Sequence, residues 1–561
     1  MSGLSKDWLK RLQREHEPLL GMSVTLLLML GAYLWRLYLL RMRFFDPDEF
    51  QHLHAAWYVS KGWLPYRDFF EHHTPGIYFF FAPLYAFFNV ETNVEQAHAF
   101  LFFARTWMWL LAGAILVLTG WLGALWRKTW VGWIAALLLS NTLMFVEKTL
   151  EVRPDGFSLT LWVACVALTV RGLRDSGPAS TPAFVWSGAL LGAAVMFTQK
   201  MLFALPGFAV AMLWYLCDRR SRGTPRQRFR NLSYQLLGFL APILLTCGYF
   251  VLRSGLSDFI EYNFLLNARW GPPLSPLYFF MHLVAQNPIY VSLAGVGFLR
   301  AFVGMFQGDG YRRAEFVAVL SAVSLAVGLF IMPTPFRQYY LMLLPLGAVF
   351  AAGLLIDAVD GIAAACRGVW PKDALSSLYV LAESAMFIIL LVFALRVSRP
   401  RVLTDHFYAA MWVVGFVAAA VSLLRWKKHL ATSILLVALS VYPIQQMRNV
   451  IPSPEWRNTE TLNHIRYVLE HTSPTESVMD GWTGLGVFRP HAWFYWFLHR
   501  EVQAMLSEQI KVNLRTNLVA GTVAPKLILF DEDLQNLSAE TTQFFIEHYV
   551  PTGTGVIWKR K

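Results

Sequence analysis

Acidic and histidine side chains gather in the stretch 42–98, which carries seven acidic and three basic residues among many aromatics. Its first cluster is DPDEFQHLH, where Asp46 before a proline, with Glu49 three residues further on, predicts the start of a helix. On that helix Asp48 is four residues and Glu49 three residues from His52, so carboxylates and an imidazole share one face. An anionic, aromatic stretch of this kind suits a polar substrate held against lipid. The alternative is that the acids only favour a helix N-terminus.

A second cluster, DFFEHHTPGIYFF, brings Glu71, His72 and His73 in front of a short apolar segment. Thr74 as N-cap with Pro75 in the first turn predicts a helix whose free N–H groups point toward the cluster. Such an N-terminus binds anions, and a lipid phosphate is the anion available at a membrane surface. Two alternatives stand beside this one. The histidines only lie at headgroup level, or the cluster binds a divalent metal.

A third group, FVEKTLEVRPDGF, spaces Glu147, Glu151 and Asp155 at steps of four residues. Pro154 interrupts a helix just before Asp155, so we expect Asp155 on a turn where a later apolar run begins, with Arg153 beside it. A solvated loop with local ion pairs would explain the same pattern.

Several cations could neutralise a phosphate. Lys200 lies in TQKMLFALPG, Arg269 in NFLLNARWGPPLSP and Arg337 in MPTPFRQYYLMLLP. Each could equally be an anchor whose charged end reaches the membrane interface. Arg105 differs from them because it lies inside an apolar run, where a charge needs a partner.

The elements that must position these residues are membrane helices. Of the 561 residues 56% are hydrophobic and only 15% are charged, and the mean hydropathy is +0.44. Soluble chains carry about 25% charged residues, so a purely soluble protein is excluded. The four cysteines are far apart and support neither a CxxC metal site nor a disulfide framework.

A membrane-spanning helix needs about 20 apolar residues. The hydropathy pattern predicts thirteen spans, near 18–40, 99–122, 130–146, 156–172, 184–199, 202–217, 232–252, 284–303, 314–332, 339–356, 379–396, 407–424 and 430–447. The apolar piece 76–88 is too short and is expected to stay at the surface.

Charge then assigns the sides of the membrane. The loop 218–230 holds six arginines and follows the sixth span, so it falls on the same side as the basic N-terminus, which the positive-inside rule makes cytoplasmic. Residues 1–17 form an amphipathic cytoplasmic lead-in, and 18–448 form the membrane domain. The stretch 42–98 and the tail 449–561 both lie on the outer face, which is the periplasm of a bacterium with its inner membrane. This use of basic residues gives no reason to expect nucleic acid as a partner.

The tail reads as a small α/β domain. We expect helices near 458–471 and 538–549, aromatic-rich helical sequence near 491–510, and strands at 477–479, 526–531 and the final GVIWK.

Taken together, these features resemble the GT-C glycosyltransferases. The resemblance rests on the DPDE opening of the outer loop, HHTPGIYFFF, the RPD turn, TQK, FRQYYLMLLP and an outer soluble tail, and it covers roughly residues 18–356. The branch most similar to the chain contains protein O-mannosyltransferases and the lipid A aminoarabinose transferase (glycosyltransferase family 39). It implies a fold of about 13 transmembrane helices with a small extracytoplasmic α/β domain.

The resemblance also implies a reaction. Such enzymes pass a sugar from a polyprenyl-phosphate carrier to a hydroxyl or amine of a glycan, lipid or protein on the outer face. The family's Asp-Glu pair matches Asp48 and Glu49, and its second acidic residue matches Asp155. Relatives have an acidic residue, Lys or His, and two prolines where this chain has Glu71, His72, His73, Thr74 and Pro75.

Glycosyl transfer needs a carboxylate to take the acceptor's proton and positive charge to hold the leaving phosphate. We expect Asp48 to be the base, with a pKa raised by burial beside other carboxylates, and inversion at the sugar. The expected phosphate ligands are His72, His73, Lys200, Arg337 and Arg105. A divalent metal, if one binds, would use Glu71, His73 and Asp48, and no other cofactor is expected. A secondary transporter or flippase is the alternative class, but it would place ionisable residues near the middle of the bilayer.

Overall fold

Apolar helices dominate the computed structural model, which describes residues 3–174, 180–218, 223–269, 274–306, 312–365 and 457–561 together with parts of 382–440. Six helical stretches are long and apolar enough to cross a membrane: Ser23–Met42, Val94–Trp126, Pro154–Arg174, Gln199–Cys217, Pro225–Leu252 and Arg337–Gly361. Six shorter apolar helices accompany them, including Gly76–Phe87, which was expected not to cross. Within the predicted span 379–396, residues 382–390 are helical, while most of the predicted span 407–424 lies outside the described residues.

The helices of the first half follow the predicted order closely. They are α1 (Gly3–Met42), α2 (Pro47–Ser60), α3 (Gly76–Phe81), the 3-10 helix η1 (Ala82–Phe87), α4 (Val94–Trp126), α5 (Thr129–Ser140), α6 (Leu143–Lys148), α7 (Pro154–Arg174), α8 (Thr181–Phe197), η3 (Gln199–Ala204) and α9 (Leu205–Cys217). One difference is that the predicted span 130–146 is two helices, α5 and α6, separated at Asn141 and Thr142. The predicted lead-in 1–17 is helical from Gly3 and continuous with the first span, since α1 covers Gly3–Met42.

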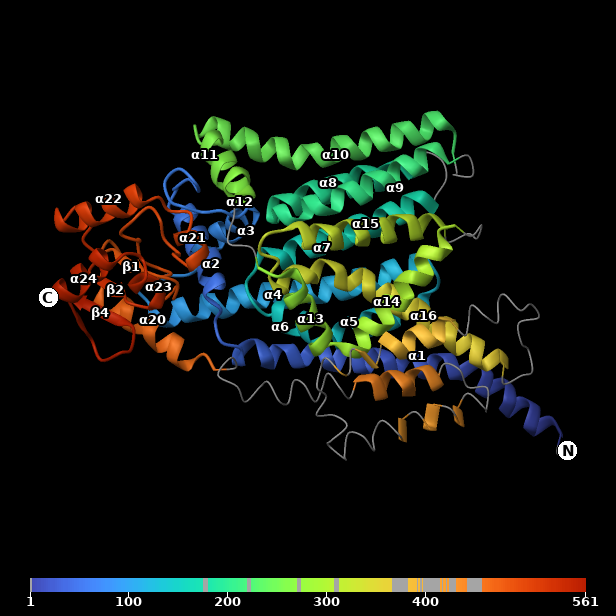
Figure 1. Cartoon of the computed structure of the whole chain (residues 1–561). Coiled ribbons are helices and arrows are strands. Elements are labelled where there is room, and N and C mark those ends of the chain that lie inside the picture. Colours follow the sequence, from blue (N-terminus) through green and yellow to red (C-terminus); the bar gives the residue numbers. More distant parts are fainter. Residues whose placement is uncertain are drawn as a thin grey trace.

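The remaining membrane helices complete the bundle. They are α10 (Pro225–Leu252), α11 (Leu256–Ile260), the π-helical turn η4 (Glu261–Leu265), α12 (Leu266–Ala268), α13 (Pro276–Gln286), α14 (Pro288–Gly304), α15 (Arg312–Ile331), η5 (Arg337–Leu343) and α16 (Leu344–Ala365). Helix α10 runs along one edge of the bundle beside α8 (Figure 1). The two approach so closely at Gly188 that a Cβ there would lie 1.9 Å from the carbonyl oxygen of Gln235.

The C-terminal domain is built on a four-stranded sheet of order β1-β2-β4-β3. Strands β1 and β2 are parallel, and the other two pairs are antiparallel. Its elements are α20 (Thr459–His471), β1 (Val478–Asp480), α21 (Arg500–Gln503), α22 (Glu508–Val519), β2 (Leu527–Leu529), α23 (Glu532–Gln535), α24 (Ala539–His548), β3 (Tyr549–Pro551) and β4 (Ile557–Arg560).

Most of the tail prediction is confirmed, but two parts are wrong. The expected helix near 491–510 is irregular until α21, because its aromatic side chains pack against the outer loop instead of along one helix face. Strand β3 was not expected, and it begins at Tyr549, directly after the last residue of α24.

This domain lies at the same end of the bundle as α2 and α3, while the N-terminus lies at the opposite end (Figure 1). The contact between the two parts is specific. Trp496 Nε1 donates to the Phe70 carbonyl at 2.6 Å, the backbone N–H of Phe70 donates to the Phe494 carbonyl at 3.0 Å, and His54 Nδ1 lies 2.9 Å from the Val487 carbonyl. The outer loop and the domain therefore share one apolar core.

Candidate active site

The predicted start of α2 is confirmed in detail. The Asp46 carboxylate accepts the N–H of Asp48 at 3.1 Å, and the Glu49 carboxylate accepts the N–H of Asp46 at 3.0 Å, which is a capping box. Because these contacts span only three residues, they follow from the local sequence. They fix the direction in which the Asp48 side chain leaves the helix.

Glu49 and Arg105 form a buried ion pair. Arg105 donates through Nη2 at 2.5 Å and Nε at 2.9 Å to the two carboxylate oxygens of Glu49, and both side chains are fully buried. Arg105 also donates to the carbonyls of Leu40, Arg43 and Phe44. The partner that Arg105 was expected to need is thus Glu49. This pair joins α2 to α4 and is enclosed by protein.

Arg153 is the centre of a larger charge network. Its guanidinium lies 2.5 Å from Asp48, 3.4 Å from Glu151, and 3.7 Å from both Asp46 and Asp155. The side chain is only 5% exposed, so these contacts are made with little water present. The sequence places Arg153 next to Asp155 but gives no sign that it reaches the α2 carboxylates.

Lys200 extends the network on the other side of Asp155. Its Nζ lies 3.0 Å from Asp155 and 3.5 Å from the centre of the Tyr339 ring. Asp155 lies in the first turn of α7, as expected from Pro154. The arrangement brings Asp48, Asp155 and Lys200, all predicted from sequence, to one place around Arg153.

A second layer of charges surrounds this centre. Glu151 accepts from Lys148 at 2.7 Å and from Arg43 at 2.9 Å. Arg337, from η5, lies 3.8 Å from Glu147 and is 29% exposed. The alternative of a solvated loop is therefore excluded for 147–155, because the charged residues there are buried and paired.

The pKa values of the two α2 carboxylates contradict the expectation for Asp48. Burial, with repulsion from Asp48 and Glu151, raises the pKa of Asp46 to about 6. Burial alone would also raise the pKa of Asp48, but the charge and hydrogen bond of Arg153 outweigh it, and the pKa of Asp48 is lowered. Asp48 is therefore ionised and weakly basic. An ionised carboxylate of this kind is better suited to stabilise positive charge than to take a proton.

The Glu71 cluster differs from its prediction. Thr74 does not cap α3, whose N-cap is Pro75 without a side-chain bond, and the Thr74 hydroxyl is buried without a hydrogen-bond partner. The N–H groups that converge here are those of His72 and His73, at 2.8 and 3.2 Å from Glu71 Oε1. Local turn geometry at 71–73 thus replaces the expected helix N-terminus.

The same cluster has the composition of a metal site. One ligand atom each from Glu71, His72 and His73 lie within 4.8 Å of one another. Burial lowers the pKa of His72 well below its ordinary value and that of His73 to about 3, which keeps both imidazoles in the neutral form that binds metal. Asp48 is not in this group, so the expected set of Glu71, His73 and Asp48 is replaced by Glu71 and the two histidines.

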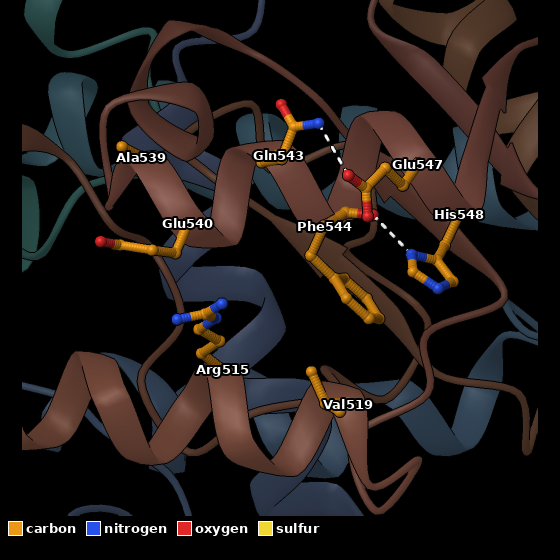
Figure 2. Close-up of a pocket in the computed structure, with 8 residues that line it drawn as sticks. All are labelled: Arg515, Val519, Ala539, Glu540, Gln543, Phe544, Glu547 and His548. Carbon is orange, nitrogen blue, oxygen red and sulfur yellow. Dashed lines mark hydrogen bonds between the residues drawn. The ribbon is translucent and has the colours of Figure 1, made fainter.

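Open hollows lie elsewhere on the described surface. Figure 2 shows one of about 450 Å³ between α22 and α24, lined by Arg515, Val519, Ala539, Glu540, Gln543, Phe544, Glu547 and His548. None of these residues contacts the Arg153 network. The candidate site is therefore defined by its buried charges and not by the depth of a cavity.

The helical arrangement is similar to that of solved structures. The chain is similar to ArnT from Cupriavidus metallidurans in the apo state, with 15% identity over 87% of this chain and 86% of that chain and a TM-score of 0.54. The same protein bound to undecaprenyl phosphate gives 15% identity, coverages of 83% and 85%, and a TM-score of 0.50. The sequence matches no protein-family model and no curated protein. At such identities the likeness concerns the fold.

Proposed function

We propose that this integral membrane protein is a glycosyltransferase that moves a sugar from a polyprenyl-phosphate carrier to a glycan, lipid or protein acceptor. The observation that carries the proposal is the buried network in which Arg153 joins Asp48 to Asp155 and Lys200, at one end of a GT-C bundle. The similarity to a structure that contains undecaprenyl phosphate supports a carrier of this chemical class.

The cations of the site suit the carrier's phosphate. Breaking the bond between sugar and phosphate leaves negative charge on a phosphate oxygen, and positive side chains in a water-poor site stabilise it. Lys200 and Arg337 are the proposed phosphate ligands, and Arg153 adds positive charge between the carboxylates. Neutral His72 and His73 can donate hydrogen bonds to phosphate oxygens.

The carboxylates of the site have two proposed roles, one at the sugar and one in positioning a cation. Asp48, kept ionised by Arg153, can stabilise the positive charge that develops on the anomeric carbon. Asp155 positions Lys200 at 3.0 Å. Attack from the face opposite the phosphate would invert the anomeric centre, and a retained anomer in the product would exclude this single step. Glu49 and Arg105 are enclosed, so we assign them the role of positioning Asp48.

A divalent ion would fit at Glu71, His72 and His73. When bound, it would supply further positive charge for the phosphate. In its absence the same residues orient one another through Glu71, which also accepts from Gln51 Nε2 at 2.9 Å.

The proposed orientation places the site on the outer face of the bacterial inner membrane, with the C-terminal domain in the periplasm. The N-terminus lies at the other end of the bundle (Figure 1), which agrees with a cytoplasmic basic terminus. Labelling of single-cysteine variants from each side of the membrane tests this orientation.

The deciding experiment incubates the purified protein with a panel of labelled polyprenyl-phosphate hexoses and pentoses, an envelope fraction as acceptor, and either metal or chelator. We expect label to leave the lipid and enter the acceptor. Label that moves across a vesicle membrane but stays on its carrier would indicate the alternative class, a flippase. If the chelator abolishes transfer of the labelled sugar, a divalent metal is required for the reaction.

A further inference from the structure

A histidine of the C-terminal domain forms a carboxylate–imidazole pair close to the charge network. His499 Nδ1 lies 2.7 Å from Glu501 Oε2, and each of the two side chains is only 13% exposed. When Nδ1–H donates to a carboxylate, the other ring nitrogen, Nε2, carries the basic lone pair. Glu501 therefore orients His499 as a proton acceptor.

The backbone before this pair is held in an unusual conformation. Phe497 has φ of 60°, a left-handed conformation that bulky residues rarely adopt. The segment is fixed on both sides, since Trp496 Nε1 donates to the Phe70 carbonyl and the N–H of Leu498 donates to the Gly481 carbonyl at 2.7 Å. Residues held in this way cluster at functional sites, where the surrounding structure maintains the strain.

The pair lies beside residues already placed in the candidate site. The rings of His499 and His72 are 6.2 Å apart. His499 is close enough to Asp48 for the two groups to interact electrostatically, and Glu501 interacts in the same way with Tyr339, whose ring covers Lys200. The C-terminal domain thus brings two titratable side chains close to the network.

Two of the carboxylates at the start of α2, Asp48 and Glu49, are held by arginines. Asp48 is ionised and bound to Arg153, and Glu49 is enclosed with Arg105. Among the described residues near the network, His73 and His499 each combine a carboxylate partner with a partly exposed ring. His73 belongs to the Glu71 cluster, whereas His499 is supplied by the C-terminal domain.

We infer that His499, oriented by Glu501, is the general base that deprotonates the acceptor. This inference rests on the proposed function and adds to it a catalytic residue from the C-terminal domain. As the acceptor oxygen forms its bond to the anomeric carbon, its proton passes to His499 Nε2. The bond between that carbon and the carrier's oxygen breaks, and its electron pair stays on the phosphate.

Comparing two kinds of acceptor distinguishes a general base from a residue with only a structural role. A hydroxyl acceptor must lose a proton, whereas azide attacks without losing one. In the full-length His499→Ala protein, transfer to the envelope fraction should fall about 100-fold or more, while transfer to azide stays near the native rate. Added imidazole should restore part of the hydroxyl reaction. Glu501→Gln should also lower the transfer rate to the hydroxyl acceptor and not that to azide, by a smaller factor of about tenfold or more.

His548→Ala provides the matched control, since this exposed histidine belongs to the remote hollow of Figure 2. Its transfer to both acceptors should equal that of the native protein. An unchanged hydroxyl rate in His499→Ala, or an equal fall with both acceptors, overturns the inference while the proposed function stands. A native protein that transfers no sugar from any carrier overturns the proposed function itself.

Discussion

Separating Glu49 from Arg105 should destabilise the protein strongly. Glu49 accepts four hydrogen bonds, from the N–H groups of Asp46 and Val152 and from Nε and Nη2 of Arg105. Removing one partner of a fully buried ion pair leaves the other charge uncompensated, which costs about 3–5 kcal/mol. Because the pair joins α2 to α4, the loss should appear in the stability of the whole outer end of the bundle.

The two single variants should differ. In Glu49→Gln the guanidinium keeps its three carbonyl partners, so we expect a loss near the lower limit, about 3 kcal/mol. In Arg105→Met the buried carboxylate loses its cation and the same three carbonyls lose their donor, so we expect about 5 kcal/mol. The double variant should lose less than the sum of the two, because no unpaired charge remains.

Unfolding of the full-length protein in detergent, followed by tryptophan fluorescence against denaturant, measures these differences. The matched control is the exposed pair Arg466 and Glu95, which are 2.7 Å apart and 42% and 75% exposed. The same replacements there should change the free energy of unfolding by about 1 kcal/mol or less. If Arg105→Met costs no more than Arg466→Met, or less than Glu49→Gln, the assigned role of the buried pair is wrong.

Three further predictions concern the site and the domain. Asp48→Asn should lower the transfer rate about 100-fold or more while carrier binding, measured with labelled undecaprenyl phosphate, changes little. Lys200→Met should instead weaken carrier binding about tenfold or more, because the phosphate loses one hydrogen bond from a charged donor. Burial and repulsion from Asp531 raise the pKa of Asp480 to about 7, and burial raises the pKa of Asp531 to about 6. Both groups bind a proton more tightly when folded, so stability is fully present below pH 4 and is lost as the pH rises toward 7. The thermal midpoint should therefore fall over that range in the native protein and fall less in Asp480→Asn.

Contacts that are local in sequence could be predicted, and distant ones could not. The capping box of α2 and the position of Asp155 depend on residues a few positions apart, and both were predicted correctly. The partner of Arg105 was predicted to exist but could not be named, because Glu49 is 56 residues away.

The lowered pKa of Asp48 was missed for the same reason. Asp48 and Arg153 are 105 residues apart, so the sequence shows only neighbouring carboxylates, which repel and raise a pKa. The raised value falls instead on Asp46, the carboxylate further from Arg153. The sequence therefore predicts that carboxylates cluster here, but contacts between residues distant in sequence determine which carboxylate stays ionised.

The charge of the network bears on how a carrier could bind. Among the described residues, the carboxylates at 46, 48, 147, 151 and 155 are matched by five cations, at 43, 148, 153, 200 and 337. Such a set is balanced before any phosphate enters, so an arriving phosphate must compete with carboxylates for Lys200 and Arg337. Asp46, with its pKa near 6, is the group that can take up a proton and compensate for the added negative charge. Under the proposed function, Asp46 adjusts the charge of the site, while Asp48 keeps its charge because Arg153 contacts it more closely.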